Sequence, residues 1–322
     1  MSAQSGATGV AQAPPRAQPR HRRAASLSEG ARAERRLGWL LCAPAVIVML
    51  AVTAYPIGYA VWLSLQRYDL RFPAARRFVG LANYATVLTD HLWWTAFGVT
   101  VFIAVVSVAV ELVLGMGLAM IMRWALLGRG AVRTAILVPY GIVTVVAAYS
   151  WQYAWTPGTG YLANLLPSGS APLTEQWPAI FIIIIIIAAE IWKTTPFMAL
   201  LLLAGLSLVP EELLRAAKVD GASGWQRLTQ VMLPLMKPAI LVALLFRTLD
   251  AFRIFDNIFI LTAGANNTRS VSILGYDNLF TALNLGIGST ISVLVFVAVA
   301  IIAFVFVRGF GTAAPGQEVD RR

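Results

Sequence analysis

Six long apolar segments alternate with polar stretches along the chain. They cover about residues 37–65, 95–122, 131–155, 178–208, 235–262 and 287–307. A helix needs about 20 consecutive apolar residues to cross the hydrocarbon of a bilayer, and each of the six segments is long enough. Because backbone polar groups in lipid must find partners within their own segment, all six are predicted to be helices. The pattern therefore predicts an all-α integral membrane protein with six transmembrane helices.

The composition supports this assignment. The chain is 58% hydrophobic and only 12% charged, whereas a soluble domain is about 25% charged. Its single cysteine, Cys42, has no partner for a disulfide bond or a thiolate metal cluster. The net charge of +10 comes from basic residues that flank apolar segments and are not interleaved with aromatic residues. Membrane lipid, and not nucleic acid, is therefore the expected partner of this charge.

The positions of the basic residues predict the orientation. If the N-terminus is cytoplasmic, 17 of the 25 Lys and Arg residues lie in or beside cytoplasmic segments, and six lie in or beside external ones. The positive-inside rule then places both termini in the cytoplasm. Residues 1–36 are predicted to be a disordered basic tail, 37–310 the transmembrane domain and 311–322 a C-terminal tail. The pair Arg22 and Arg23 precedes an apolar segment that is too long for the core of an export signal and lacks a cleavage site.

The cytoplasmic loop 209–234 is predicted to be a helix, a turn and a second helix. Pro210, followed by Glu211 and Glu212, fits the start of a helix, and Gly221 tolerates the left-handed conformation found where helices stop. The first helix has an apolar side formed by Leu213, Leu214, Ala217 and Val219. Because so short a helix is marginal alone, we expect it to dock on another protein or, alternatively, on lipid headgroups.

The residues of this loop resemble a known motif. Ala216-Ala217, then Gly221 and later Leu233-Pro234 match the E-A-A-x-x-x-G…I-x-L-P loop of ABC importer permeases. In that family the loop seats in a cleft of the nucleotide-binding subunit, so the resemblance implies coupling to a separate ATPase. The family's usual leading glutamate is Arg215 here, which puts one polar contact in doubt. The implied coupling residues are Leu214, Arg215, Ala216, Ala217, Asp220, Gly221, Ala222, Leu233 and Pro234.

Further landmarks narrow the resemblance to carbohydrate permeases of the maltose-importer type. They are Tyr55-Pro56, the stretch Val-Gly-Leu-Ala-Asn-Tyr at 79–84 and the stretch Ile-Trp-Lys-Thr-Thr-Pro-Phe at 191–197. The similarity covers nearly all of residues 37–310 and is strongest to the trehalose importer permeases of mycobacteria. It implies a type I ABC importer permease fold in the bacterial inner (plasma) membrane and transport of a disaccharide. It also implies four partners: a second homologous permease, two ATP-binding subunits and an extracytoplasmic sugar-binding lipoprotein.

Charged residues interrupt two of the apolar segments. Glu190 and Lys193 lie three residues apart in the fourth segment, and Arg247 and Asp250 repeat this spacing in the fifth. A charge at the centre of a membrane costs about 2.5 to 3.5 kcal/mol, so these side chains are expected to face inward. They can form salt bridges between helices, or they can line a wet cavity for a polyhydroxylated ligand. The residues alone leave both uses open.

The family resemblance favours a substrate path at these positions. In maltose-type permeases, the residues around the Trp-x-x-x-Pro-aromatic motif and those on the span after the coupling loop face the translocation path. Arg253 and Asn257 fall with Asp250 within an arc of about 60° at helical spacing and are predicted to continue the polar stripe. The implied path residues are Glu190, Lys193, Thr194, Phe197, Arg247, Asp250, Ala251, Arg253 and Asn257, with the ring of Phe197 suited to stack on a sugar.

Two further features have ordinary explanations. Gly115 and Ala119 have the spacing of close helix packing, but both residue types are common in membrane helices, so no special contact is expected. Aromatic residues at the end of the third segment are expected to form an interfacial belt, with a ligand gate as the alternative. These residues are Tyr149, Trp151, Tyr153 and Trp155.

Motifs for catalysis and nucleotide binding are missing from the sequence. There is no G-x-x-x-x-G-K-[ST] phosphate loop, so the chain is expected to bind no cofactor and to leave ATP and Mg²⁺ to a partner ATPase. The only histidines, His21 and His91, lie in the tail and in an external loop, so neither a metal site nor a catalytic residue is predicted. A stand-alone secondary transporter or channel also fits intramembrane charges, but it leaves the 216–234 pattern unexplained. A membrane enzyme would need a loop acid and base, and Asp69 and Asp90 show no such pattern.

Overall fold

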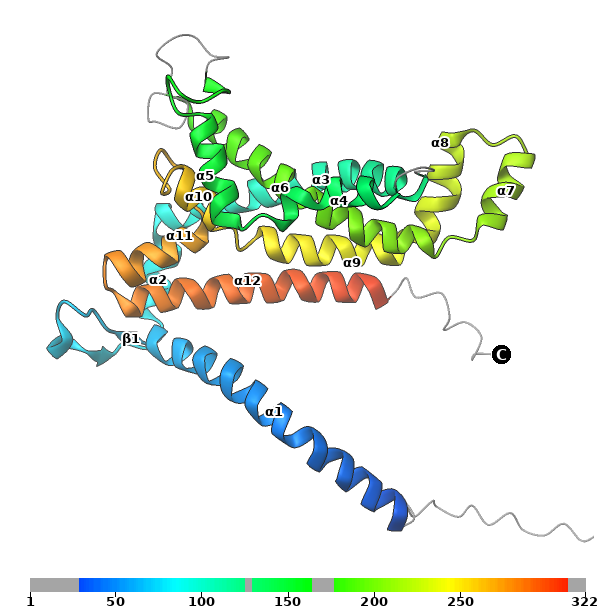
Figure 1. Cartoon of the computed structure of the whole chain (residues 1–322). Coiled ribbons are helices and arrows are strands. Elements are labelled where there is room, and N and C mark those ends of the chain that lie inside the picture. The colour runs from blue at the N-terminus through cyan, green and yellow to red at the C-terminus, as the bar shows by residue number, and fades with distance from the viewer. Residues whose placement is uncertain (1–28, 125–128, 164–176, 312–322) are drawn as a thin grey trace, which may run out of the picture. The chain divides into compact units, whose positions relative to one another are not determined.

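The computed structural model describes residues 29–124, 129–163 and 177–311, and most of them are helical (Figure 1). Residues 1–28 and 312–322 of the two predicted tails lie outside this described part. The long helices are α1 (Glu29–Ser64), α3 (His91–Trp124), α6 (Ala179–Ser207), α9 (Leu233–Ala251) and α12 (Leu285–Gly311). The shorter helices are α2 (Ala82–Thr89), α4 (Arg129–Gly141), α5 (Thr144–Ala154), α7 (Glu211–Val219), α8 (Gly224–Gln226), α10 (Asp256–Leu261) and α11 (Val271–Tyr276). Between them lie η1 (Pro73–Ala75), the π-helical turns η3 (Arg227–Met232) and η4 (Asp277–Thr281), and the antiparallel pair β1 (Gln66–Arg67) and β2 (Arg77–Phe78).

The first helix begins earlier than predicted. α1 starts at Glu29, whereas the sequence pattern placed residues up to 36 in a disordered tail. The additional residues, 29–36, are rich in Ala, Arg and Glu, which are good helix formers. They extend the apolar helix by about two polar turns. The contacts divide the chain into one unit up to Pro56 and a second from Ile57 onward.

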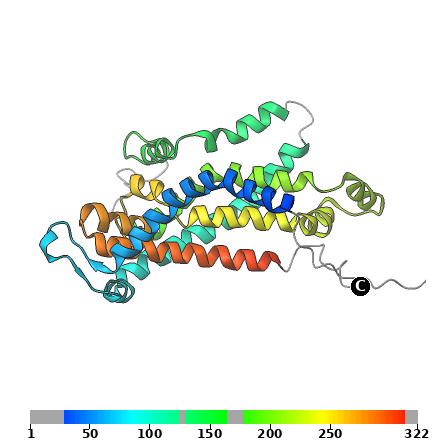
Figure 2. The ribbon, with the colours of Figure 1, turned by 90° about the horizontal axis from the view of Figure 1, so that it is seen from below.

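The core of the second unit is formed by α3, α6 and α9, with α12 beside α9 (Figures 1 and 2). The side chains packed there include Met198, Leu202, Leu206 and Met236. A Cβ atom added at Gly115 of α3 would lie 2.8 Å from Cγ of Met198, and Ala119 has no exposed surface. The expectation that these small residues make no special contact was therefore wrong: they let α3 approach α6 closely.

The third predicted span is a broken helix. α4 and α5 meet at 85° across Ile142 and Val143, where a single helix was predicted. Pro139 removes a backbone donor before the break, and Gly141 favours chain reversal. With this bent pair counted once, six segments are long and apolar enough to cross a membrane. The prediction of six transmembrane segments is confirmed, with the third one bent.

The fifth predicted span, which reaches Leu261, contains a break. α9 ends at Ala251, and a non-helical stretch separates it from α10, so the predicted continuous helix to residue 262 was wrong. The sequence contains no Gly or Pro at this break. Its cause is tertiary packing, because the break lets Ile254 and Ile258 enter a buried cluster with Ile182 and Ile186 of α6.

Candidate functional site

The predicted coupling loop is a helical hairpin of α7, α8 and η3. It projects from the end of the bundle opposite to α10 and α11, and both views show this separation (Figures 1 and 2). α3 and α6 end near it and α9 begins from it. The charge bias of the sequence predicts that this end is the cytoplasmic one.

Local chemistry fixes the turn of the hairpin. Gly221 has a φ of +83°, which favours glycine. Its N–H donates to the carbonyl of Lys218 over 3.2 Å, and the N–H of Ala222 donates to the carbonyl of Ala217 over 2.9 Å. These two bonds are the Schellman closure of a helix. A capping box between Ser223 and Gln226 then starts the second helix, so the predicted helix, turn and helix are confirmed.

The second helix of the hairpin continues into the membrane without a break. η3 runs directly into α9, and the N–H of Leu233 donates to the carbonyl of Leu228, five residues back. This wide turn accommodates Pro234, which has no N–H and crowds the preceding turn of a regular helix. The second helix of the loop and the span predicted from residue 235 are therefore parts of one helical run. The hairpin is joined to α9 by helix and not by a flexible loop.

The predicted apolar side of the first hairpin helix is divided between the core and the surface. Leu214 packs against the core, whereas Leu213 and Val219 are 47% and 87% exposed. Trp225 of α8, which the sequence analysis did not single out, is 72% exposed. Of the predicted coupling residues, Arg215, Ala216, Asp220, Gly221 and Pro234 are exposed, and Leu214, Ala217, Ala222 and Leu233 are half-buried. The tip of the hairpin thus presents apolar surface that nothing in the described part of the chain covers.

Arg215, where the motif usually has glutamate, forms an ion pair inside the hairpin. Its Nη2 lies 2.9 Å from Oε2 of Glu211, one turn earlier on α7. Both side chains are largely exposed, so the pair adds at most a few tenths of a kcal/mol, about 0.3 to 0.5, to the helix. The arginine is therefore compatible with the helical loop.

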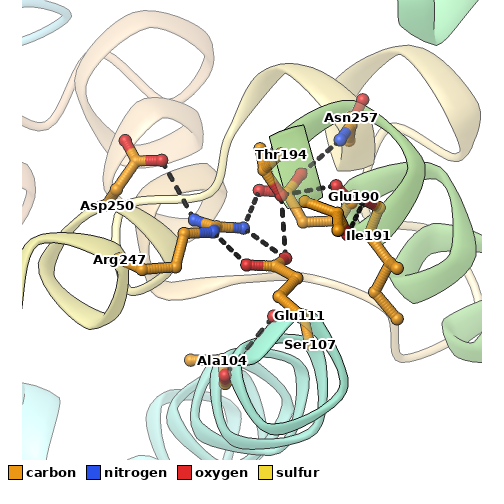
Figure 3. Close-up of polar contacts among 10 residues, drawn as sticks. Ala104, Ser107, Glu111, Glu190, Ile191, Thr194, Arg247, Asp250 and Asn257 are labelled. Atoms are coloured by element: carbon orange, nitrogen blue, oxygen red, sulfur yellow. Dashed lines mark hydrogen bonds and ion pairs between the residues drawn. The ribbon is translucent and has the colours of Figure 1, made fainter. Parts of the chain in front are cut away.

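A buried cluster of charges lies at the centre of the bundle (Figure 3). Arg247 of α9 has no exposed surface, and its guanidinium donates to Glu111 of α3 over 2.5 and 3.0 Å. It also lies 2.7 Å from Glu190 of α6 and 3.0 Å from Asp250, one turn further along α9. We call these four residues the Arg247 cluster. One cation is therefore shared by three carboxylates from three helices.

Neutral side chains complete the hydrogen bonds of this cluster. Thr194 donates to Glu111 over 2.8 Å, and Asn257 of α10 donates to Glu190 over 2.5 Å. Glu111 was missed by the sequence analysis, which weighed only the charges of the fourth and fifth segments. The available signal was a single carboxylate in the otherwise apolar segment 95–122. A buried charge is stable only when it is paired and hydrogen-bonded, and the cluster meets both requirements.

Lys193 and Phe197 contact the break between α4 and α5. The Nζ of Lys193 donates to the carbonyl of Ile142 over 2.7 Å and lies 5.9 Å from the ring centroid of Tyr140. Phe197 stacks on the same ring, with centroids 5.3 Å apart and planes 15° apart. Lys193 pairs with no carboxylate among the described residues. It instead satisfies a backbone oxygen that the broken helix leaves free.

A polar cavity of about 290 Å³ lies beside the Arg247 cluster. Among the predicted path residues, it is lined by Glu190, Lys193, Thr194, Asp250, Arg253 and Asn257. Arg247, Ala251 and Phe197 do not line it: the first two are buried behind it, and the ring of Phe197 lies against Tyr140. Tyr140 and Thr144 line the cavity and were not predicted. The cavity therefore combines donors, acceptors, both signs of charge and an aromatic ring.

Comparisons with known proteins identify the family of the chain. Residues 111–312 match the family of binding-protein-dependent transport system inner membrane components. The chain is 67% identical over 290 residues to the trehalose transport system permease protein SugA of Mycobacterium tuberculosis, covering 90% of this chain and 94% of that protein. It is 39% identical over 278 residues to the trehalose/maltose transport system permease protein MalF of Thermococcus litoralis, covering 85% and 94%. The fold is similar to that of a chain in the crystal structure of a bacterial ABC transporter involved in the import of the acidic polysaccharide alginate, with a TM-score of 0.73. The two chains are 22% identical, and the match covers 87% of this chain and 98% of that chain.

Proposed function

Because the chain belongs to the family of binding-protein-dependent transport system inner membrane components, we propose that it forms half of the translocation path for a disaccharide, with trehalose as the first candidate. The chain is a multi-pass membrane permease of an ABC sugar importer and not an enzyme. Family membership decides against the alternative of a stand-alone secondary transporter. The trehalose assignment is supported by the 67% and 39% identical relatives, whose names include that sugar.

The polar cavity beside the Arg247 cluster is the proposed site of substrate passage. Its volume is about 290 Å³, close to the lower end of the range of ligand-pocket volumes, about 300 to 1,000 Å³. A small volume is expected if a second permease supplies the other wall of the site. Asp250 and Arg253 are exposed toward solvent and line the cavity, so they are the side chains best placed to bond sugar hydroxyls. In this proposal Arg247 does not contact the sugar. It holds Glu190 and Asp250 in place from behind.

The hairpin is the proposed contact with the ATPase. Its support is the exposed apolar surface of Val219 and Trp225 at the tip, together with the helical continuity from η3 into α9. Apolar surface of this kind on a projecting element is typical of a protein contact. A displacement of the hairpin would be passed to α9, which carries Arg247 and Asp250 at the edge of the cavity.

The proposed assembly contains a second homologous permease, two ATP-binding subunits and an extracytoplasmic sugar-binding lipoprotein. ATP and Mg²⁺ are bound by the ATPase in this proposal, because the chain lacks a phosphate loop. The support for partners in general is the family itself, whose members act in binding-protein-dependent transport systems.

Uptake of radiolabelled trehalose in a strain that lacks this permease is the decisive experiment. Uptake should disappear in the deletion strain and return with the plasmid-borne gene. Competition by unlabelled trehalose, maltose and sucrose then tests the sugar. Normal uptake in the deletion strain would refute the transport assignment, and stronger competition by another sugar would refute trehalose alone.

A further inference from the structure

A second cavity lies at the membrane end of the hairpin, away from the Arg247 cluster. It has a volume of about 510 Å³ and lies between α7, the end of α3 and the start of the second hairpin helix. Its charged lining consists of four cationic side chains, from Arg123, Arg215, Lys218 and Arg227, and one carboxylate, from Glu211. The cavity therefore carries a marked excess of positive charge.

Two of these cations form no ion pair with any residue that the structure describes. Arg215 is paired with Glu211, and Arg123 donates to the carbonyls of Leu206 and Val209 at the end of α6. Lys218 and Arg227 form no ion pair within the described part of the chain. The Nε–H of Arg227 is moreover a buried donor for which the described residues offer no acceptor. Unmet donors of this kind are costly unless an anion or water completes them.

An apolar groove leads toward this cavity along the surface of α3. The groove has a volume of about 540 Å³ and is lined on α3 by residues that include Val113, Gly117 and Ile121, with α4 and α6 forming its other sides. Trp124 lines the basic cavity and follows Ile121 by three residues on the same helical face. At 1.5 Å per residue it lies about 4.5 Å further along the axis. Apolar and basic surfaces thus follow each other along one helix, from the membrane interior to its edge.

We propose that the groove and the cavity together bind one anionic phospholipid. The headgroup phosphate lies between Lys218 and Arg227, and one acyl chain follows the groove past Ile121 and Gly117. Basic pockets at the cytoplasmic ends of transmembrane helices suit anionic headgroups, and tryptophan is typical of the membrane interface. A zwitterionic headgroup would bring a further positive charge into an already positive site. A free phosphate ion would leave the groove empty.

Native mass spectrometry of the complete importer, purified in mild detergent, tests this proposal. The preparation is exposed to equal amounts of phosphatidylglycerol and phosphatidylcholine. Lys218→Gln/Arg227→Gln is expected to retain about tenfold less phosphatidylglycerol than the wild type, which corresponds to about 1.4 kcal/mol. The matched control is Lys237→Gln/Arg308→Gln, which removes an exposed lysine near the start of α9 and an exposed arginine in the last turn of α12, neither of which lines the cavity. Equal retention by the two double variants, or no preference for the anionic lipid, would overturn the proposal.

A second variant tests the groove without altering any charge. Gly117 lines the groove, and a Cβ atom there would meet no atom within 4 Å, so the side chain of Gly117→Leu starts from open space in the groove. We expect this variant to lose phosphatidylglycerol as well. If it keeps the lipid, the groove holds no acyl chain. If inorganic phosphate added at millimolar concentration displaces the wild-type lipid completely, the cavity is a site for free anions. Either result refutes the proposal that one phospholipid occupies both the cavity and the groove, and both readouts are independent of sugar transport.

Discussion

Nε of Arg247 lies 2.5 Å from a carboxylate oxygen of Glu111, and neither side chain exposes any surface. The two residues are 136 positions apart and belong to α9 and α3. Because Glu190 of α6 lies 2.7 Å from the same guanidinium, one cation compensates two buried carboxylates and joins three helices. Breaking such an arrangement from one side costs more than the arrangement itself contributes, because it leaves charges buried without a partner.

Replacement of Arg247 by methionine is predicted to destabilise the permease strongly. Glu111 and Glu190 would be left without their cation, at a cost of about 3 to 5 kcal/mol. A thermal unfolding scan of the purified complex should show this as a clearly lower Tm, with less permease in the membrane. Arg253→Met is the matched control, because Arg253 is exposed. Adding Glu111→Gln to the Arg247 variant should recover part of the loss, and an unchanged Tm for Arg247→Met would contradict the prediction.

Lys193 is predicted to stabilise the break between α4 and α5. Lys193→Met leaves the carbonyl of Ile142 without its donor, and an unsatisfied buried acceptor costs about 1 to 3 kcal/mol. Lys193→Arg keeps a donor and should lose less. The measurement is again the Tm of the complex, with the exposed Lys237→Met as control. Equal Tm values for Lys193→Met and the control would show that the ammonium does not hold the break.

The features of the fold that were predicted correctly are those that depend on residues close together in the chain. The turn of the hairpin follows from residues next to each other in the chain, and the helix stop at a left-handed Gly221 was predicted for that reason. The number of spans was likewise predictable, because length and hydropathy alone decide it. The break at Arg253 was not predictable, because isoleucine packing between helices decides it. The break at Ile142 had a local signal in Pro139 and Gly141 that the sequence analysis did not use, and a lysine from α6 completes it.

The candidate site could be predicted only in part, because it too depends on tertiary contacts. The spacing of Arg247 and Asp250 predicted an inward-facing pair, but their helix continues only to Ala251, so Asn257 comes from α10. Partners across helices cannot be assigned from spacing within one helix. Glu111 was readable as a charge in an apolar segment, yet nothing local indicated that Arg247 is its partner.

Asp250 and Arg253 are predicted to act on sugar affinity and not on stability. Both line the polar cavity, and the side chain of Asp250 is 61% exposed. Loss of a hydrogen bond between a charged group and the sugar costs about 1.5 to 3 kcal/mol, so Asp250→Asn or Arg253→Gln should raise the KM for uptake about tenfold or more. Concentration-dependent uptake measures this, with Arg308→Gln as control. An unchanged KM in both variants, at wild-type Tm, would place the sugar elsewhere.

The exposed tip of the hairpin is predicted to hold the ATPase. Val219 is 87% exposed and makes little contact within the chain, so Val219→Asp should leave the Tm of the permease unchanged. If Val219 lies in the interface with the ATPase, the new carboxylate would lose its hydration without gaining a partner. This would weaken the binding free energy by several kcal/mol. We therefore expect much less ATPase to co-purify with the permease and uptake to fall at least about tenfold. Leu81→Asp places a carboxylate at a comparably exposed apolar position, 72% exposed, at the opposite end of the bundle. It should retain the ATPase, and full retention by Val219→Asp would mean that the ATPase docks on another surface.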